Sequence, residues 1–282
     1  MYSPKVALGA FLHASAARGI ESNSGSGAGY ETSNPAAQWL EVVEEYTKLS
    51  LTFATDRFPA LSGAAQRSRQ LRSDGQRYFA GLWQREMPLG LAWCARGPLR
   101  QRSEEWIAPT WSWASVESGV WWPGKYFDIV KSYLTSFEAD CVLDLEDADP
   151  TGRLKSATLT VSGGLVSEGV LLWEEDLMEN NLNEMFSVQF GPRKFTGCFW
   201  PDYVFHESNG EGCVEHGSKV VWLALLDVLW PGGRTHEYTG LILRESSQAP
   251  GEFERIGRFR IEDTEGHEFI MARATERSLI IV

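Results

Sequence analysis

The sequence of 282 residues has little of what marks membrane proteins, disulfide-rich proteins or zinc proteins. No stretch approaches the ~20 consecutive apolar residues that a membrane-spanning helix needs, so no membrane span is expected. The cysteines number only four, Cys94, Cys141, Cys198 and Cys213, and none belongs to a C-x-x-C pair. A zinc site is therefore not expected. Reduced thiols and a missing Asn-x-Ser/Thr sequon predict a cytoplasmic protein.

The familiar catalytic motifs are missing as well. The sequence holds no Gly-rich dinucleotide or phosphate loop, no G-x-S-x-G turn and no H-E-x-x-H pair. The acids of residues 144–149 do not have the spacing of a D-D-x-x-D motif. Cys213 and His216 lie three residues apart, but no second pair of ligands accompanies them. We therefore expect no metal and no cofactor.

The net charge of −12 argues against nucleic acid as a partner, because its phosphates repel an acidic protein. The charge is unevenly distributed. Residues 57–102 contain nine arginines and two acids, whereas residues 138–149 contain six acids and no base. One interpretation is that these two segments pair with each other or are solvated. The alternative is an anion-accepting patch for a carboxylate or phosphate group of a ligand.

The first part of the chain predicts a leader followed by helices. Residues 1–35 end in a Gly-, Ser- and Asn-rich stretch that is typical of a flexible linker. Helical spacing of apolar residues predicts a helix over 36–50. A second helix is expected to open at Pro59, with Asp56 as its cap and with Leu61, Ala64, Ala65 and Leu71 on one face. Residues 78–94 are apolar and are expected to be helical, which completes a helical lobe over 36–105.

From Trp111 onward the pattern predicts strands. They are expected at about 111–117, 119–122, 137–145, 157–166, 169–173, 186–190, 194–200, 219–228, 238–244, 253–262, 267–272 and 278–282. The run from Lys219 to Leu229 is continuously apolar and suits a strand buried on both faces. Gly163-Gly164 reads as a turn. The expected fold is α+β, with the helical lobe packed on a predominantly antiparallel β-sandwich or partly open β-barrel over 106–282, and with 36–282 as one domain.

Tryptophan is unusually frequent, with 12 in the chain. Trp83, Trp93 and Trp113 are expected to fill the core, each with its indole N–H on a backbone acceptor. Trp121 and Trp122 are adjacent on a predicted strand, so one of them should face away from the core.

A small-molecule site is expected where the helical lobe meets the β-rich region, because ligand sites favour such junctions. Residues 78–83, 111–122 and 199–206 are the segments expected to line it. The candidate substrate-binding residues are Tyr78, Trp83, Trp111, Trp121 and Trp122, with Arg77 and Arg85 for a carboxylate, and the candidate catalytic residues are Tyr203 and His206.

Four short blocks occur in order along the first part of the chain, followed by a later one. They are LTFATDRFPALSGAA (51–65), YFAGLW (78–83), LAWC (91–94), APTWSWAS (108–115) and GLILRESSQAPGEFERIGRFRI (240–261). Together they resemble the region that follows the effector domain in fungal heterokaryon-incompatibility (HET) proteins. The two strings that mark the effector domain itself, Y-x-A-L-S-Y-x-W-G and R-x-W-x-x-Q-E, do not occur. The resemblance implies ancestry, since that region of the family has no established activity.

Two functions from different classes remain. The first is a cofactor-free cyclase or isomerase that folds an apolar terpenoid or polyketide intermediate, in which a carboxylate can be present, for a pericyclic, Diels–Alder-type reaction. Orientation and one or two hydrogen bonds suffice for such a reaction. The alternative is a non-catalytic recognition or regulatory module in heterokaryon incompatibility. An enclosed aromatic cavity favours the first function, and a flat exposed apolar patch favours the second.

Overall fold

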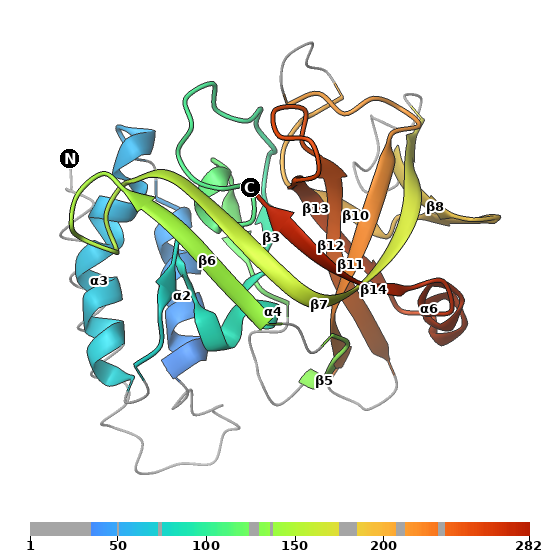
Figure 1. The fold of residues 1–282 in the computed structure, drawn as a ribbon, viewed down its shortest axis with the longest axis horizontal. Coiled ribbons are helices and arrows are strands. Elements are labelled where there is room, and N and C mark those ends of the chain that lie inside the picture. Colours follow the sequence, from blue (N-terminus) through green and yellow to red (C-terminus); the bar gives the residue numbers. More distant parts are fainter. Residues whose placement is uncertain are drawn as a thin grey trace.

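The fold is known from a computed structural model, which describes most of the chain after the predicted leader. The described residues are 35–49, 51–72, 75–123, 130–135, 138–174, 185–206, 212–230 and 235–282. Residues 1–34 of the leader lie outside them. Figure 1 shows two helices at one end of the molecule and most of the strands at the other.

Two helices open the described chain. Helix α2 spans Pro35–Thr47 and buries an apolar face that includes Trp39 and Tyr46, as the periodicity predicts. Helix α3 spans Arg57–Leu71 and begins two residues before the predicted Pro59. The placement of Leu71 on its buried face is wrong, because this side chain is 61% exposed at the end of the helix.

The expected cap of α3 is also corrected by the structure. Asp56 stands at the N-cap position, but its side chain makes no capping hydrogen bond. Its carboxylate instead accepts a hydrogen bond from Nη2 of Arg153 at 2.8 Å. The residue therefore joins the helix to the β-rich part of the chain.

Residues 78–94 do not form the predicted helix. They form strands β1 (Tyr78–Phe79) and β2 (Leu82–Trp83), helix α4 (Met87–Gly90) and the start of strand β3 (Cys94–Arg96). The hairpin between β1 and β2 turns at Ala80 and Gly81, whose φ angles are 43° and 96°. These angles are incompatible with a right-handed helix. The segment is apolar because almost every side of it is buried, and such burial hides the periodicity.

Most of the remaining chain forms a single large sheet. After β4 (Gly119–Trp121), which pairs with β3, its ten described strands are β5 (Val130–Tyr133), β6 (Glu138–Leu145), β7 (Leu154–Trp173), β8 (Phe186–Phe190), β9 (Arg193–Thr196), β10 (Phe199–Pro201), β11 (Lys219–Leu229), β12 (His236–Glu245), β13 (Phe253–Ile261) and β14 (Thr275–Ile281). All described pairings in it are antiparallel except β13–β14. The pairings β11–β12, β12–β13, β13–β14, β14–β7 and β7–β11 close a ring, which we call the barrel. The mixed α+β class is confirmed.

Strand β7 bends where a turn was predicted. Gly163 has a φ of 79°, and the register with β14 shifts between Arg277 and Leu279, so the two glycines lie at a β-bulge. Up to Val166 the strand pairs with β6 and β14, and beyond it with β11 and β8. The prediction of two strands separated by a turn is therefore wrong, and Figure 1 shows one long curved strand.

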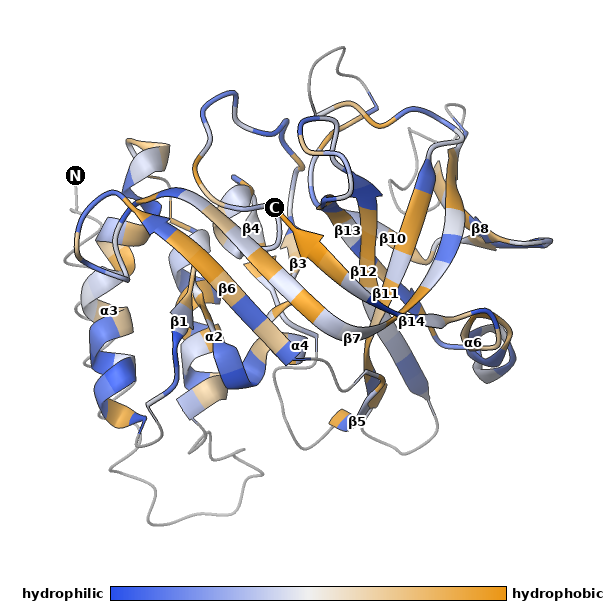
Figure 2. Ribbon diagram, viewed as in Figure 1, coloured by the Kyte–Doolittle hydropathy of each residue, from blue (hydrophilic) through white to orange (hydrophobic). Residues whose placement is uncertain are grey.

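Strand β11 is buried on both faces, as predicted. Val221, Leu223 and Leu225 belong to a core cluster that also contains Trp39 of α2 and Ile281 of β14. Trp222, on the other face, belongs to a second cluster that is rich in aromatic residues. Figure 2 shows the hydrophobic bands along these strands. The helices and the sheet therefore share the first of two cores.

Two further segments differ from the predicted strands. Residues 113–115 form a 3-10 turn, and residues 264–271 form helix α6 (Thr264–Met271). Asp263 explains the helix, because its carboxylate accepts hydrogen bonds from the backbone N–H groups of Glu265 and Gly266 at 3.1 and 2.9 Å. Among the described residues, no helix has the length and apolar character to cross a membrane.

Candidate functional site

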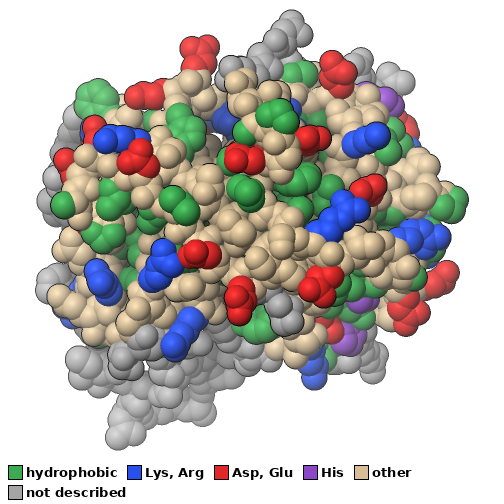
Figure 3. Space-filling view, viewed as in Figure 1, with side chains coloured by type: hydrophobic (Ala, Val, Ile, Leu, Met, Phe, Trp, Pro, Cys, Tyr) green, Lys and Arg blue, Asp and Glu red, His purple; other side chains and the backbone are tan. Residues whose placement is uncertain are grey.

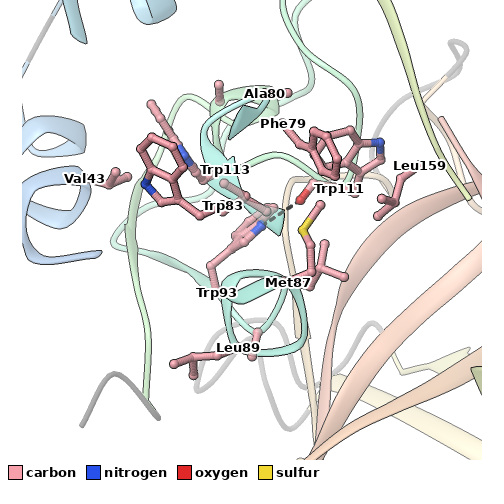
Figure 4. Packing of buried hydrophobic residues seen from close by; sticks show 14 of the residues in the cluster. Val43, Phe79, Ala80, Trp83, Met87, Leu89, Trp93, Trp111, Trp113 and Leu159 are labelled. Atoms are coloured by element: carbon pink, nitrogen blue, oxygen red, sulfur yellow. Dashed lines mark hydrogen bonds between the residues drawn. The ribbon is translucent and has the colours of Figure 1, made fainter. Parts of the chain in front are cut away.

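The indole groups of buried tryptophans hold the loops of the first core together. Trp39 and Trp113 both donate to the carbonyl of Gly81, at 2.9 and 3.1 Å. Trp93 donates to the carbonyl of Trp111 at 3.0 Å, which is the dashed line in Figure 4. The predicted core role of Trp83, Trp93 and Trp113 is confirmed by their burial. The expected backbone acceptor is found for Trp93 and Trp113, but the prediction is wrong for Trp83, because its buried Nε1 has no acceptor among the described residues.

The aromatic residues chosen as substrate-binding candidates lie mostly in this core. Tyr78, Trp83 and Trp111 are buried, and Trp83 packs in the same cluster as Trp113 (Figure 4). Trp122 is buried and donates to the carbonyl of Gly90 at 2.9 Å, whereas Trp121 is half-buried. The expectation that one residue of this adjacent pair faces away from the core is therefore confirmed. None of the five candidates lines either of the two hollows described below.

The candidate Arg77 covers the edge of a strand. Its Nη1 lies 2.7 Å from Oδ1 of Asp140, and its Nη2 donates to the carbonyl of Cys141 at 3.0 Å. Nε2 of Gln84 donates to the next outward carbonyl, that of Ala139, at 3.4 Å. Among the described strands, β6 pairs only with β7, so these two side chains cover its open edge.

Arg85, the second arginine expected to hold a carboxylate, is exposed and lines neither hollow. The ion pair between Arg77 and Asp140 joins the basic and acidic segments of the sequence. Figure 3 shows basic and acidic side chains interspersed on the face that carries β6 and β7. This arrangement agrees with the interpretation that those segments pair or are solvated.

Of the two catalytic candidates, Tyr203 reaches a hollow and His206 does not. The Tyr203 hydroxyl donates to the carbonyl of Gly212 at 2.9 Å, and the guanidinium of Arg102 lies 4.1 Å from the centre of its ring. Burial raises the pKa of Tyr203 in spite of this arginine, so the hydroxyl keeps its proton. His206 packs edge-on against Phe186 in the second core.

The hollow that Tyr203 reaches has a volume of about 850 Å³ and is called the barrel hollow here. It lies between residues 101–108 and the turn that joins β12 to β13. Its apolar walls are Trp106, Ile107, Ala108, Val204, Ala249 and Val282. Trp106 is 45% exposed, which is unusual for so large an apolar side chain in this protein. A ligand can therefore cover it at little structural cost.

A charged cluster lies at the edge of the same hollow. Oε2 of Glu254 accepts from Nη1 of Arg102 at 3.2 Å and from Nη2 of Arg244 at 2.9 Å, and Oε1 accepts from Ser246 at 2.9 Å. Burial alone raises the pKa of Glu254, but the two arginines outweigh it and hold the pKa below its usual value. Arg102 also donates to the carbonyl of Arg255 at 3.0 Å, while its buried Nε has no acceptor among the described residues.

A second hollow, of about 790 Å³, is called the lobe hollow here. It is lined by the end of α2, by residues 117–120 and by Leu49, Leu51, Thr52, Ala54, Arg96, Pro98 and Arg100. Trp113 and Val120 come from the segment 111–122 that was expected to line a site. The described part of the chain contains no group of three His, Cys, Asp or Glu residues able to hold a metal ion.

Sequence reasoning did not select Arg102, Trp106 or Glu254. Glu254 lies within the block that resembles HET proteins, but Arg102 and Trp106 lie between blocks. The three come together because residues 101–108 pack against a turn about 150 positions later, and no local pattern encodes that contact. Comparison with protein-family models, curated proteins and solved structures finds no match for the chain.

Proposed function

We propose that the barrel hollow binds an apolar small molecule with a carbonyl group and that the protein catalyses its cyclisation or isomerisation without a cofactor. The observation that carries this proposal is the guanidinium of Arg102 in the lining of a hollow that also has apolar side chains, with an Nε–H that has no acceptor among the described residues. An unpaired buried donor costs free energy, and a ligand oxygen removes that cost.

The walls can orient the substrate. In an intramolecular cycloaddition, two π bonds are converted into two σ bonds, and no atom leaves or enters. Most of the barrier that a protein can remove is then the cost of bringing the two ends of a flexible chain together. Trp106 and Ile107 offer an apolar surface against which an extended chain folds.

The charged edge can polarise the substrate. A hydrogen bond from a cationic donor to a carbonyl withdraws electrons from a conjugated alkene and stabilises the charge that develops in the transition state. Glu254 holds Arg102 in place through the 3.2 Å contact. Tyr203 is a positioning residue in this proposal, because its ring lies against the guanidinium and its hydroxyl is bonded to Gly212.

The first test compares metabolites of the source organism with and without the gene. Since cyclisation conserves atoms, the deletion strain should accumulate a precursor with the same mass as the missing product. Purified protein should then convert this precursor, and chelators or nicotinamide cofactors should make no difference. If no isobaric pair changes, or if chelation abolishes the conversion, the proposal fails.

Two tryptophans give a matched pair of variants for the same assay. Trp106→Ala should slow turnover or change the product ratio while the stability stays within about 0.5 kcal/mol of wild type. Trp113→Ala should lower the free energy of unfolding by about 3–5 kcal/mol, because its indole is fully buried. If Trp106→Ala leaves turnover and selectivity unchanged, the barrel hollow is not the reaction site.

The resemblance to HET proteins supports a second candidate, a cytoplasmic recognition module that binds a protein partner. The observation in its favour is that Phe53, four residues before α3, and Leu71, the last residue of α3, are 63% and 61% exposed. A double change of both residues to serine should abolish capture of a partner and leave the turnover of any small molecule unchanged. The resemblance to HET proteins is compatible with both proposed functions. Neither function involves binding to nucleic acid.

A further inference from the structure

The lobe hollow carries an excess of positive charge in a protein whose net charge is −12. Its lining includes four cationic side chains, Lys48, Arg57, Arg96 and Arg100, and a single carboxylate, that of Glu117. Lys48 is paired outside the hollow with Glu45 at 2.6 Å. The three arginines therefore decide which ligand the hollow attracts.

Arg57 forms the inner part of this cationic surface. Its Nη1 donates to the backbone carbonyls of Ala114, at 2.9 Å, and Val116. Among the described residues, no carboxylate forms an ion pair with it, and no acceptor contacts its Nη2 or Nε. Burial lowers the pKa of Arg57, and the more distant Glu117 and Tyr46 oppose this shift only in part. An anion in the hollow would supply the missing counter-charge.

Arg96 and Arg100 form the outer part. Arg96 is exposed and has no hydrogen-bond or ion-pair partner in the described part of the chain. Nη1 of Arg100 lies 3.5 Å from Oε2 of Glu117, a distance that makes a weak exposed ion pair. Both guanidinium groups can therefore turn toward a ligand without breaking a strong contact, and a guanidinium binds a carboxylate or a phosphate through two parallel hydrogen bonds.

The inner wall of the lobe hollow is apolar: the buried rings of Tyr46 and Trp113 form its base, and the half-buried Leu49 and Leu51 are the apolar side chains that a ligand can reach. Tyr46 and Trp113 meet edge to face with ring centroids 6.0 Å apart, and both line the hollow together with Leu49, Leu51 and Val120. The Tyr46 hydroxyl donates to the backbone carbonyl of Arg57 at 2.8 Å, so the aromatic wall and the innermost cation are fixed relative to each other. A free inorganic anion would leave this wall unused.

We infer that the lobe hollow is a binding site for a small organic anion, in which a carboxylate or phosphate group meets the three arginines and an apolar body covers Leu49 and Leu51. This site is separate from the barrel hollow, and the two share none of their lining residues. The inference therefore stands whether or not the barrel hollow is a reaction site.

Two fluorescent probes test the inference directly. 8-Anilinonaphthalene-1-sulfonate combines an aromatic body with an anionic group, and N-phenyl-1-naphthylamine has the same body without the charge. We expect Arg96→Ala/Arg100→Ala to weaken binding of the anionic probe by about tenfold or more and to leave the neutral probe within about twofold. Equal weakening of both probes, or of neither, overturns the inference.

Matched controls separate a local effect from a change in overall charge. Arg67 and Arg69 are exposed on α3 and lie outside both hollows, so Arg67→Ala/Arg69→Ala, which also removes two positive charges, should leave the affinity for the anionic probe unchanged. Trp106→Ala should also leave it unchanged, which would show that the probe does not report the barrel hollow. Loss of affinity in either control would overturn the assignment to the lobe hollow.

Arg57 needs a milder change, because it also bonds the Ala114 and Val116 carbonyls. Arg57→Lys keeps the charge but cannot form the two-pronged contact, so we expect several-fold weaker binding of the anionic probe with a thermal midpoint near that of wild type. Unchanged affinity in a folded Arg57→Lys protein would remove Arg57 from the site.

Competition against the anionic probe identifies the head group and tests the role of the apolar wall. Decanoate and decyl phosphate should both displace the probe, and the stronger competitor indicates which head group the hollow prefers. Inorganic phosphate at the same concentration should displace little. If inorganic phosphate competes as well as decyl phosphate, the hollow binds only an adventitious ion, and the inference fails.

Discussion

The guanidinium of Arg255 lies 3.4 Å from the centre of the Trp93 ring and donates at 2.6 Å to the backbone carbonyl of the same residue. It also donates to the carbonyl of Leu91 at 2.6 Å and forms two hydrogen bonds with Asp202, at 2.8 and 3.1 Å. Neither charged side chain is more than 2% exposed. One arginine of β13 therefore fixes a segment more than 160 residues earlier, and this contact joins two of the blocks that resemble HET proteins.

Removal of the Arg255 guanidinium should be strongly destabilising. In Arg255→Met, Asp202 stays buried without its partner, so we expect the free energy of unfolding to fall by about 3–5 kcal/mol. The control Lys194→Met breaks an exposed ion pair with Glu174 and should cost about 1 kcal/mol or less. Urea denaturation measures both variants. If both variants lost a similar free energy of unfolding, the buried ion pair of Arg255 would contribute no more to stability than an exposed one.

Glu254 should make part of the stability depend on pH. Burial raises the pKa of its carboxyl, but Arg244 and Arg102 hold the resulting pKa below the usual value. The unfolded chain then takes up this proton first, so the contribution is complete above about pH 4.3 and is lost as the pH falls through the folded pKa. We expect the urea midpoint of Glu254→Gln to fall less than that of wild type between about pH 6 and about pH 3.5. If the urea midpoints of the variant and of wild type fell by the same amount, this prediction would be contradicted.

Gly81 should tolerate no side chain. An added Cβ would lie 2.3 Å from Nε1 of Trp113, and the Gly81 carbonyl accepts the indole bonds of Trp39 and Trp113. Gly97 also has a positive φ but has open space around it. We expect Gly97→Ala to cost about 1–2 kcal/mol from backbone strain and Gly81→Ala to cost clearly more. Thermal denaturation compares the two variants. Equal losses of stability would show that the Trp113 side chain moves aside for the added methyl group.

Removal of the two side chains that cover β6 should promote self-association. Arg77→Ala/Gln84→Ala exposes the outward carbonyls of Ala139 and Cys141, and an open strand edge is a template for pairing between chains. We expect dimers or larger species in size-exclusion chromatography, with stability near wild type because the lost ion pair is exposed and the two other lost contacts are only partly buried. The control Arg85→Ala also removes one positive charge and should elute as the wild-type protein does. A monomeric double variant would rule out the edge-covering role.

The sequence predicts elements well where one local rule decides them. Helix α2 follows from apolar spacing, and the double burial of β11 follows from its unbroken apolar run. The indole bonds of Trp93 and Trp113 follow from the need of a buried N–H for an acceptor, although the same rule fails at Trp83, whose Nε1 has none among the described residues.

The sequence-based predictions are wrong where contacts between distant parts of the chain determine the local structure. Gly163 reads locally as a turn, but the partners of β7 keep the strand continuous through a bulge. Residues 78–94 are buried except around Arg85, and so continuous a run of buried residues leaves no period from which to read strand or helix. The barrel hollow escapes prediction for the same reason, since Arg102 and Glu254 meet only after the whole barrel has closed.

The bent strand β7 has a consequence for biosynthesis. It pairs with β11 and with β14, and β14 begins about a hundred residues after β7 ends. The ring therefore cannot close until β14 has been synthesised, and β7 must wait that long for one of its partners. Non-local pairing of this kind folds slowly and leaves strand edges unpaired in the meantime. A nascent chain of this protein should accordingly depend on chaperones until β14 has left the ribosome.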